Sequence, residues 1–343
     1  MSNRMYIIPI FIPHKGCNNM CVFCNQRKIS GELKDVTTED IKNIIDNYLS
    51  INSVIKHTQI QVAFYGGSFT GIETEKQIEF LKVAKEYIDN KKISSIRLST
   101  RPDYISKEIL TYLKEYGVKT IELGVQSLNE DVLLASKRGH NASRVYESAQ
   151  IIKEFGFELG LQTMLGLPHS NEEFEIETAR KVIEMRPSIV RIYPTLVIKD
   201  TELAQMYEKH EYIPYTVDKA VDISAKLMKM YNEAGIIVIR TGLQNTDNIK
   251  DGGDVIAGPF HPAFGELVKQ RVYRKDIETK ISDCNFKNIS IICNRKDISK
   301  ILGNKKENIK YLNIKFNVNI KIIENNNYVE GKYELKEGVW WSK

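Results

Sequence analysis

Three of the five cysteines lie within eight residues near the start of the chain, at Cys17, Cys21 and Cys24. Thiolates are soft anionic ligands, and three of them at this spacing suit a [4Fe–4S] cluster whose fourth iron has no protein ligand. A structural zinc site is the alternative, but such sites usually have four protein ligands, and His14 is the candidate at hand for a fourth. The spacing therefore predicts a metal site and favours the iron–sulfur cluster.

The two remaining cysteines, Cys284 and Cys293, lie far along the chain. An odd number of cysteines in a chain of 343 residues argues against a disulfide framework and indicates a reducing compartment. The sequence has no apolar run long enough to cross a bilayer, and its first residues do not form a signal-peptide pattern. These features predict a cytoplasmic location and no membrane partner.

Polar and glycine-rich motifs recur along the first two-thirds of the chain. Gly66, Gly67 and Ser68 follow the apolar run QVAFY, and a glycine pair there lets the backbone approach a ligand closely. The later motifs are TRPD at 100–103, ELGVQS at 122–127, KRGH at 137–140, LGLP at 165–168 and RIYPTLVI at 191–198.

The elements that must position these motifs alternate between short β-branched runs and longer amphipathic segments, which predicts a parallel sheet covered by helices. The expected strands are 6–12, 61–65, 95–100, 119–125, 157–164 and 189–193. The expected helices between them are 38–49, 75–89, 107–116, 141–155 and 172–185. Six such units predict an α/β fold with a partial (β/α)6 TIM-type barrel. In such barrels functional residues gather at the C-terminal ends of the strands, and the motifs fall there.

The rest of the chain predicts a helix at 216–235, a strand at 236–241, a polar loop at 245–258 and a helix at 261–282. We expect a core with its extension at 1–258, a linking helix at 259–285 and a small basic α+β module at 286–343. The segment 286–343 contains twelve Lys/Arg and six Asp/Glu, which gives it a net charge of +6. The whole chain has a net charge of +5, so its positive charge is concentrated in this segment. A basic module of this kind favours an anionic partner.

Within the basic module the pattern is strand (289–293), helix (296–302), loop (303–306), helix (307–315) and strand (318–324). This β-α-α-β order resembles a KH-type RNA-binding module, whose Gly-x-x-Gly loop clamps a nucleic-acid backbone. Lys306 replaces the second glycine here, while Lys305 and Lys306 offer positive charge to phosphates. The alternative is a small solvated cap with its lysines turned outward.

The cysteine motif with Phe23 just before its last cysteine resembles the signature of the radical S-adenosylmethionine (SAM) superfamily, and the Gly66-Gly67 loop follows about 40 residues later, as in that superfamily. The resemblance implies that SAM chelates the open iron. It also implies that Phe23 lies against the SAM adenine, and that the Gly66–Ser68 backbone pairs with the SAM amino group.

Over residues 5–215 the order of TRPD, GVQS, RGH and YPTLVI is similar to the catalytic subunit of Elongator, elongator complex protein 3, a tRNA wobble-uridine modifying enzyme. Oxygen-independent coproporphyrinogen oxidase shares GVQ and GLP but less of the rest. The resemblance implies that Gln126 and Arg138 lie near SAM, with Arg138 matching its carboxylate at two points. Gln162 stands where relatives place an acid on the ribose, and Arg101 where others place a SAM-binding acid.

The reaction that this resemblance implies begins when a low-potential donor of the flavodoxin or ferredoxin type reduces the cluster. SAM is then cleaved to methionine and a 5′-deoxyadenosyl radical, which abstracts a hydrogen atom from a substrate. In the Elongator family that substrate is an acetyl group, whose radical adds to uridine C5. The residues after 198 do not resemble the acetyltransferase domain of that family, and the extra cysteines of its zinc site are lacking.

The predicted function is therefore a radical SAM transferase that modifies tRNA, at a wobble uridine. One alternative is a radical SAM oxidoreductase or transferase that acts on a small molecule, in the manner of coproporphyrinogen oxidase. A second alternative is a non-catalytic RNA-binding protein with a structural zinc.

Overall fold

The computed structural model of the chain describes residues 5–12, 17, 21–25, 36–51, 59–243, 249 and 252–338. The chain forms two compact units, Met1–Thr216 with Met230–Phe260, and Val217–Lys229 with His261–Lys343. His14, considered above as a zinc ligand, lies outside the described residues, as does part of the expected loop 245–258. Within the described residues, no helix combines the length and the apolar character that a membrane span requires.

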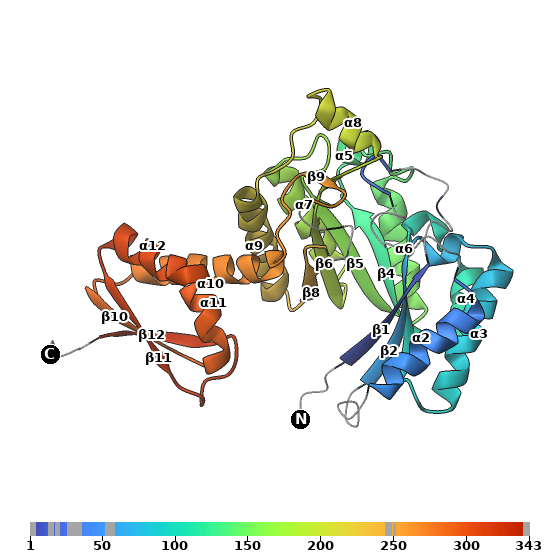
Figure 1. The fold of residues 1–343 in the computed structure, drawn as a ribbon, viewed down its shortest axis with the longest axis horizontal. Helices are drawn as coiled ribbons and strands as arrows, with labels where there is room; N and C mark the ends of the chain where they lie inside the picture. Colours follow the sequence, from blue (N-terminus) through green and yellow to red (C-terminus); the bar gives the residue numbers. More distant parts are fainter. Residues whose placement is uncertain are drawn as a thin grey trace. The chain divides into compact units, whose positions relative to one another are not determined.

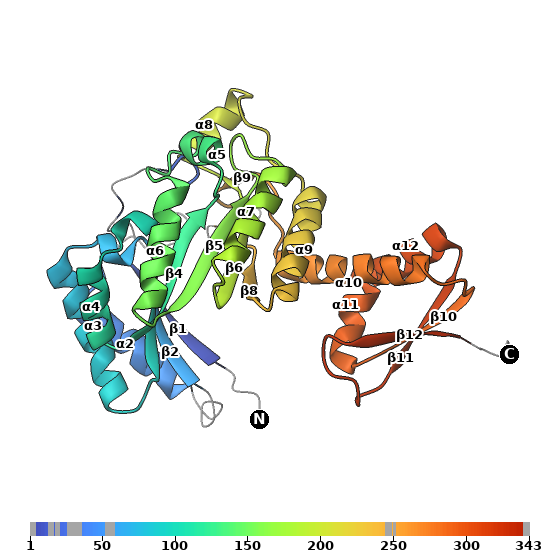
Figure 2. The same cartoon turned by 180° about the vertical axis from the view of Figure 1, so that it is seen from behind.

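The first unit is built on a seven-stranded sheet in which all neighbouring strands are parallel, in the order β1-β2-β3-β4-β5-β6-β8. The strands are β1 (Met5–Ile12), β2 (Gln59–Gly66), β3 (Ser95–Thr100), β4 (Val118–Gln126), β5 (Glu158–Leu165), β6 (Ile189–Pro194) and β8 (Ile237–Thr241). The sheet curls into a half-barrel with helices on its outer face (Figures 1 and 2). The long helices between its strands are α2 (Thr38–Ser50), α3 (Thr74–Asp89), α4 (Lys107–Glu115), α6 (Ala142–Glu154) and α7 (Glu172–Glu184). The predicted partial barrel is confirmed, with β8 as a further strand beyond the sixth.

The two faces of the sheet differ because side chains alternate along each strand. In β4, Ile121 and Leu123 are fully buried, on the face that packs against the helices. Glu122 and Gln126, at the intervening positions of the same strand, line a cavity on the inner face, and Arg191 does so from β6. The outward side chains therefore form the apolar core, while the inward side chains form a polar site.

Several short elements were not predicted, namely α5 (Glu130–Ala135), α8 (Glu202–Glu208) and an antiparallel pair of β7 (Val197–Ile198) with β9 (Val255–Ala257). The expected sixth strand ends at Pro194, so the last residues of the RIYPTLVI motif belong to β7 instead. Part of the expected loop 245–258 is β9. These elements are too short for a hydrophobic period to reveal them. α5, α8 and β9 lie at the same end of the barrel (Figures 1 and 2).

The second unit contains the start of α9 (Val217–Glu233), the long α10 (Phe264–Ser282) and a three-stranded sheet. The elements after α10 are β10 (Asn288–Cys293), α11 (Ile298–Leu302), α12 (Glu307–Phe316), β11 (Asn319–Glu324) and β12 (Tyr333–Glu337). The strand order is β11-β10-β12, with β11 parallel and β12 antiparallel to the central strand. Ile277 and Ile281 of α10 share a buried core with Ile289 and Ile291 of β10 and Leu312 of α12. The expected β-α-α-β order is present, and β12 adds a strand that was not expected.

Candidate active site

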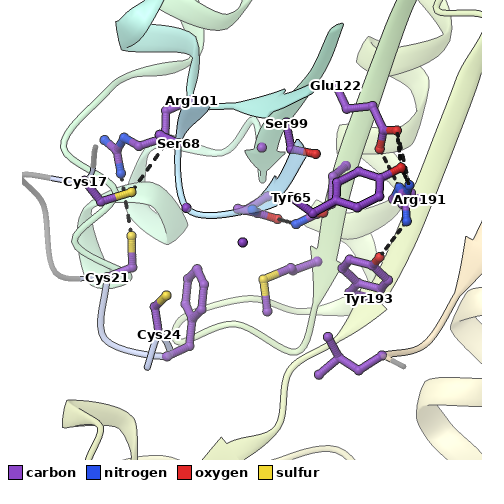
Figure 3. Close-up of a pocket in the computed structure, with 18 of the residues that line it drawn as sticks. Cys17, Cys21, Cys24, Tyr65, Ser68, Ser99, Arg101, Glu122, Arg191 and Tyr193 are labelled. Atoms are coloured by element: carbon purple, nitrogen blue, oxygen red, sulfur yellow. Dashed lines mark hydrogen bonds and ion pairs between the residues drawn. The ribbon is translucent and has the colours of Figure 1, made fainter. Parts of the chain in front are cut away.

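A cavity of about 670 Å³ lies within the barrel, and the ends of β2, β4, β5 and β6 contribute to its wall. All the residues that were predicted to hold the cluster or SAM line this one cavity. They are Cys17, Cys21, Phe23, Cys24, Gly66, Gly67, Ser68, Arg101, Gln126, Arg138 and Gln162. Figure 3 shows the three cysteines on one side of the cavity and Tyr65, Glu122 and Arg191 on the other. Lys305 and Lys306, the predicted RNA-binding residues, lie in the second unit.

The segment from Cys21 to Cys24 is a tight turn in which the Cys24 amide donates to the Cys21 carbonyl at 3.0 Å. Both backbone groups of Val22, between these cysteines, bond to distant parts of the chain. Its amide donates to Ser136 O at 3.2 Å, and its carbonyl accepts from Leu203 N at 2.8 Å. The Val22 side chain is buried with Leu203 in an apolar cluster. The short α5 and α8, which were missed in the sequence, therefore fix the position of the cysteine turn.

The donor set at the cavity consists of three thiols, which fits an iron–sulfur cluster. All five cysteines are described, and none forms a disulfide. Within the described ranges, no three His, Cys, Asp or Glu side chains are grouped closely enough to hold a single metal ion. Cys17, Cys21 and Cys24 line the same cavity, and cysteine thiolates are the ligands that iron–sulfur clusters require.

The glycine loop after β2 is held against the first strand. Gly66 has φ +108°, and a Cβ there would lie 2.8 Å from the Ile12 carbonyl oxygen, so a side chain does not fit at this position. The Gly67 amide donates to the same Ile12 oxygen at 3.0 Å. The Ser68 hydroxyl accepts a hydrogen bond from the Cys17 thiol at 3.3 Å, as Figure 3 shows. The loop therefore joins β1, β2 and the first cysteine of the motif.

Two buried arginines converge on Cys21. Arg138 Nη1 lies 3.1 Å from the Cys21 sulfur, and Arg101 Nη1 lies 3.7 Å from it. Arg101 also forms a bidentate pair with Asp103, in which both N–O distances are 2.9 Å. Burial disfavours the charge of Arg101, but the hydrogen bond and charge of Asp103 outweigh burial and raise its pKa. The guanidinium groups of Arg101 and Arg138 therefore place positive charge next to the sulfur of Cys21.

The end of β4 contains a bulge, and Gln126 adopts φ +69° there, in the left-handed region that non-glycine residues seldom occupy. Gln162 of β5 donates its side-chain amide to Gln126 Oε1 at 3.3 Å. Strained backbone of this kind gathers at ligand sites because the surrounding structure must hold it in place. The two glutamines form a paired amide surface in the cavity wall.

The side of the cavity opposite the cysteines contains a charged network that sequence reasoning missed. Glu122 accepts from Arg97 Nη1 at 2.9 Å and from Arg191 Nε at 2.5 Å. Arg191 also donates to the Tyr65 hydroxyl at 2.7 Å and the Tyr193 hydroxyl at 3.2 Å. Burial, followed by the charge of Glu122, raises the pKa of Tyr65 to about 12, so that its hydroxyl stays protonated. The available signal was one charged residue between apolar neighbours in each of three strands, Arg97, Glu122 and Arg191.

His140, in the KRGH motif, follows Arg138 by two residues and is influenced by its charge. Burial and the charge of Arg138 lower the pKa of His140 to about 4. Its Nδ1 atom lies 3.3 Å from the Asn141 carbonyl, and its buried Nε2 atom has no hydrogen-bond partner among the described residues. The imidazole is therefore neutral at physiological pH.

The comparisons with known proteins agree with this architecture. Residues 11–182 match the model of the radical SAM superfamily, and residues 187–274 match the model of the radical SAM C-terminal domain. The first match alone covers half of the chain. The chain therefore belongs to the radical SAM superfamily of enzymes.

The similar proteins narrow the family further. The chain is 25% identical over 248 residues to the tRNA uridine(34) acetyltransferase of Methanocaldococcus infernus, covering 62% of this chain and 46% of that protein. It is 35% identical over 144 residues to Elongator complex protein 3 of Danio rerio, covering 41% of this chain and 26% of that protein. The solved structure of the archaeal Methanocaldococcus infernus Elp3 with an N-terminal deletion has a TM-score of 0.63 at 21% identity, covering 82% of this chain and 64% of that one. The chain is thus related to the Elongator complex protein 3 group, and it spans less than half the length of these two curated relatives.

Proposed function

We propose that this chain is a radical SAM enzyme that modifies tRNA, at a wobble uridine. The observation that carries the proposal is that every predicted cluster and SAM residue lines one cavity in the barrel. Relatives of the chain are named tRNA uridine(34) acetyltransferase and Elongator complex protein 3, which supports tRNA as the substrate.

In this proposal Cys17, Cys21 and Cys24 hold a [4Fe–4S] cluster. When bound, the cluster and SAM would supply a 5′-deoxyadenosyl radical, with the electron coming from a donor of the flavodoxin or ferredoxin type. Arg138 is suited to the SAM carboxylate because its buried Nε atom has no acceptor among the described residues, while its Nη2 atom bonds to Gly124 O at 2.5 Å. A carboxylate at Nε would satisfy this donor with a charge-assisted hydrogen bond.

The other SAM contacts that we propose are made by residues in the wall of the cavity. Phe23 packs against the apolar cluster that contains Val22 and also lines the cavity, so it offers an apolar wall to the adenine ring. Gly66 and Gly67 line the cavity, and the carbonyl groups of this loop can accept hydrogen bonds from the SAM amino group. The amide pair of Gln126 and Gln162 can bond to ribose hydroxyls, since amides both donate and accept.

For the second unit we propose a role in binding RNA. Lys305 and Lys306 are exposed and adjacent, with φ of +48° and +63°, so the loop between α11 and α12 is held in a left-handed conformation. On α12 the ring of Tyr311 lies 4.6 Å from the Arg274 guanidinium and 5.3 Å from Lys315 Nζ. An exposed aromatic ring beside cations, of which Lys315 is exposed and Arg274 half-buried, suits phosphates and unpaired bases. This supports a KH-like module more than a passive cap.

The experiment that tests the proposal is mass spectrometry of tRNA nucleosides from cells with and without the gene. We expect one modified uridine to disappear in the deletion strain, to return with the wild-type gene, and to stay absent with a Cys21→Ala gene. Identical nucleoside profiles would contradict the proposal. If SAM cleavage by the purified protein is then stimulated by a metabolite and not by tRNA, the substrate is a small molecule.

A further inference from the structure

One edge of the Arg101 guanidinium is bound by the carboxylate of Asp103. Its Nε and Nη2 atoms each lie 2.9 Å from one oxygen of Asp103, and the Arg101 side chain is 4% exposed. Nη2 also donates to the carbonyl oxygen of Arg138. The edge of a guanidinium that normally clamps a carboxylate at two points is therefore occupied by Asp103. The remaining nitrogen, Nη1, is directed at the sulfur of Cys21.

Arg138 approaches the same sulfur from another part of the chain. Its Nη1 atom lies 3.1 Å from Cys21 Sγ, and its Nη2 atom is fixed on the carbonyl of Gly124. Both arginines and Cys21 are buried, so little water screens their charges. Cys17, by contrast, contacts the neutral hydroxyl of Ser68. Figure 3 shows the Arg101 side chain reaching toward Cys21.

We propose that Arg101, oriented by Asp103, is a positioning residue that donates to the Cys21 sulfur together with Arg138 and makes the cluster easier to reduce. The proposal rests on the cluster part of the proposed function and assigns Arg101 to the cluster rather than to SAM. Hydrogen bonds to cluster sulfurs, and the charge around them, set the reduction potential of an iron–sulfur cluster. A reduced cluster carries one more negative charge, so a nearby buried cation stabilises the reduced form more than the oxidised form.

The test uses the anaerobically reconstituted full chain without SAM. Variants Arg101→Gln and Asp103→Asn are compared with wild type by potential titration, with the reduced cluster detected by electron paramagnetic resonance. Arg144→Gln is the matched control, because Arg144 donates to the nearby Ile105 carbonyl and touches no cysteine. Iron and sulfide are measured first in each protein.

We expect the reduced-to-oxidised ratio, measured at the wild-type midpoint potential, to fall about tenfold in Arg101→Gln, equal to a shift of about 59 mV for one electron. Asp103→Asn should lower the ratio by less, because the guanidinium remains but loses its orientation. Arg144→Gln should keep the wild-type ratio. Pulsed resonance in light and heavy water should show an exchangeable proton coupled to the cluster that is weaker or absent in Arg101→Gln.

An unchanged ratio in Arg101→Gln with weakened SAM binding would overturn the proposal and make Arg101 a SAM ligand. If Arg101→Gln holds no cluster, the Asp103→Asn ratio decides, and a wild-type value there overturns the proposal. A shifted potential in a protein that never modifies tRNA would leave this inference intact and refute the tRNA proposal alone. A wild-type chain that binds no iron would refute both.

Discussion

The Nε atom of Arg191 lies 2.5 Å from Oε2 of Glu122 inside the barrel, where the two side chains are 11% and 4% exposed. The same carboxylate accepts from Arg97 Nη1, so one anion is shared by two buried cations. Arg191 in turn orients the hydroxyls of Tyr65 and Tyr193 at the cavity wall. The shape of the wall opposite the cysteines therefore depends on Glu122.

Replacing Glu122 with Gln should lower the free energy of unfolding by about 3–5 kcal/mol, because both guanidiniums would lose a buried anionic partner. The measurement is urea unfolding of the purified chain. The control is Glu202→Gln, which removes an exposed ion pair with Lys137 whose side chains are 41% and 58% exposed. That change should cost less than about 1 kcal/mol. Equal costs for the two variants would show that the buried network contributes little.

Gly66→Ala should destabilise the chain more than Gly235→Ala. Both glycines have positive φ, +108° and +75°, so alanine is strained at either position, by about 1–2 kcal/mol. A Cβ at Gly235 would have nothing within 4 Å, whereas at Gly66 it would lie 2.8 Å from the backbone oxygen of Ile12. We therefore expect a greater loss of unfolding free energy, and a lower iron content, in Gly66→Ala alone. Equal losses would show that the backbone at Ile12 moves away from the added Cβ at little cost in free energy.

Sequence reasoning located the long elements because their periods are clear. α3 and β4 span sixteen and nine residues, enough for the 3.6 and 2.0 repeats to appear, and both were predicted to within a residue at each end. β7 and β9 contain two and three residues and pair across more than fifty positions of the chain, so nothing local identifies them. The cysteine motif was visible because its three cysteines are close together in sequence.

The partners of the buried charges could not be predicted in the same way. Arg97 lies between Ile96 and Leu98, an alternation that places its side chain on the inner face of a strand. Arg97 pairs with Glu122 because of the register of β3 on β4, and this register is set by the whole fold. Arg101 and Cys21 are eighty residues apart, and their contact follows from the anchoring of the cysteine turn by α5 and α8.

Stability of the apo chain should fall as the pH falls from about 6.5 toward 4, in part because of His140. Burial and the Arg138 charge lower its pKa to about 4 in the folded state, against 6.5 for an ordinary histidine. The unfolded chain therefore binds a proton in this window that the folded chain does not, which favours unfolding. In His140→Gln the free energy of unfolding should depend less steeply on pH between 7 and 5. A wild-type slope in His140→Gln would contradict the assignment.

Replacing any one of Cys17, Cys21 or Cys24 with Ala should abolish stable iron binding, because the cluster would lose one of its three protein ligands. Anaerobic metal analysis of the wild-type chain should give about four iron and four sulfide per chain, the content of one [4Fe–4S] cluster. Cys284→Ala is the control, since this thiol lies in the second unit and donates to the Lys280 carbonyl at 3.0 Å. Zinc without sulfide in the wild-type protein would instead support a structural zinc site.

Lys305 and Lys306 form an exposed lysine pair in the second unit. Replacing Lys305 and Lys306 with Gln should weaken tRNA binding and reduce the slope of log affinity against log salt by about 1–2, because each lost phosphate contact removes about 0.7–0.9 from that slope. Lys91 and Lys92 provide a matched control: they too are adjacent and exposed, Lys91 has φ +57°, and they precede β3 at the end of the barrel away from the glycine loop. Replacing that pair with Gln should leave the slope unchanged. Because both double variants remove the same charge, a change confined to Lys305 and Lys306 identifies their loop as an RNA contact, and equal slopes would mean that the second unit is a structural cap.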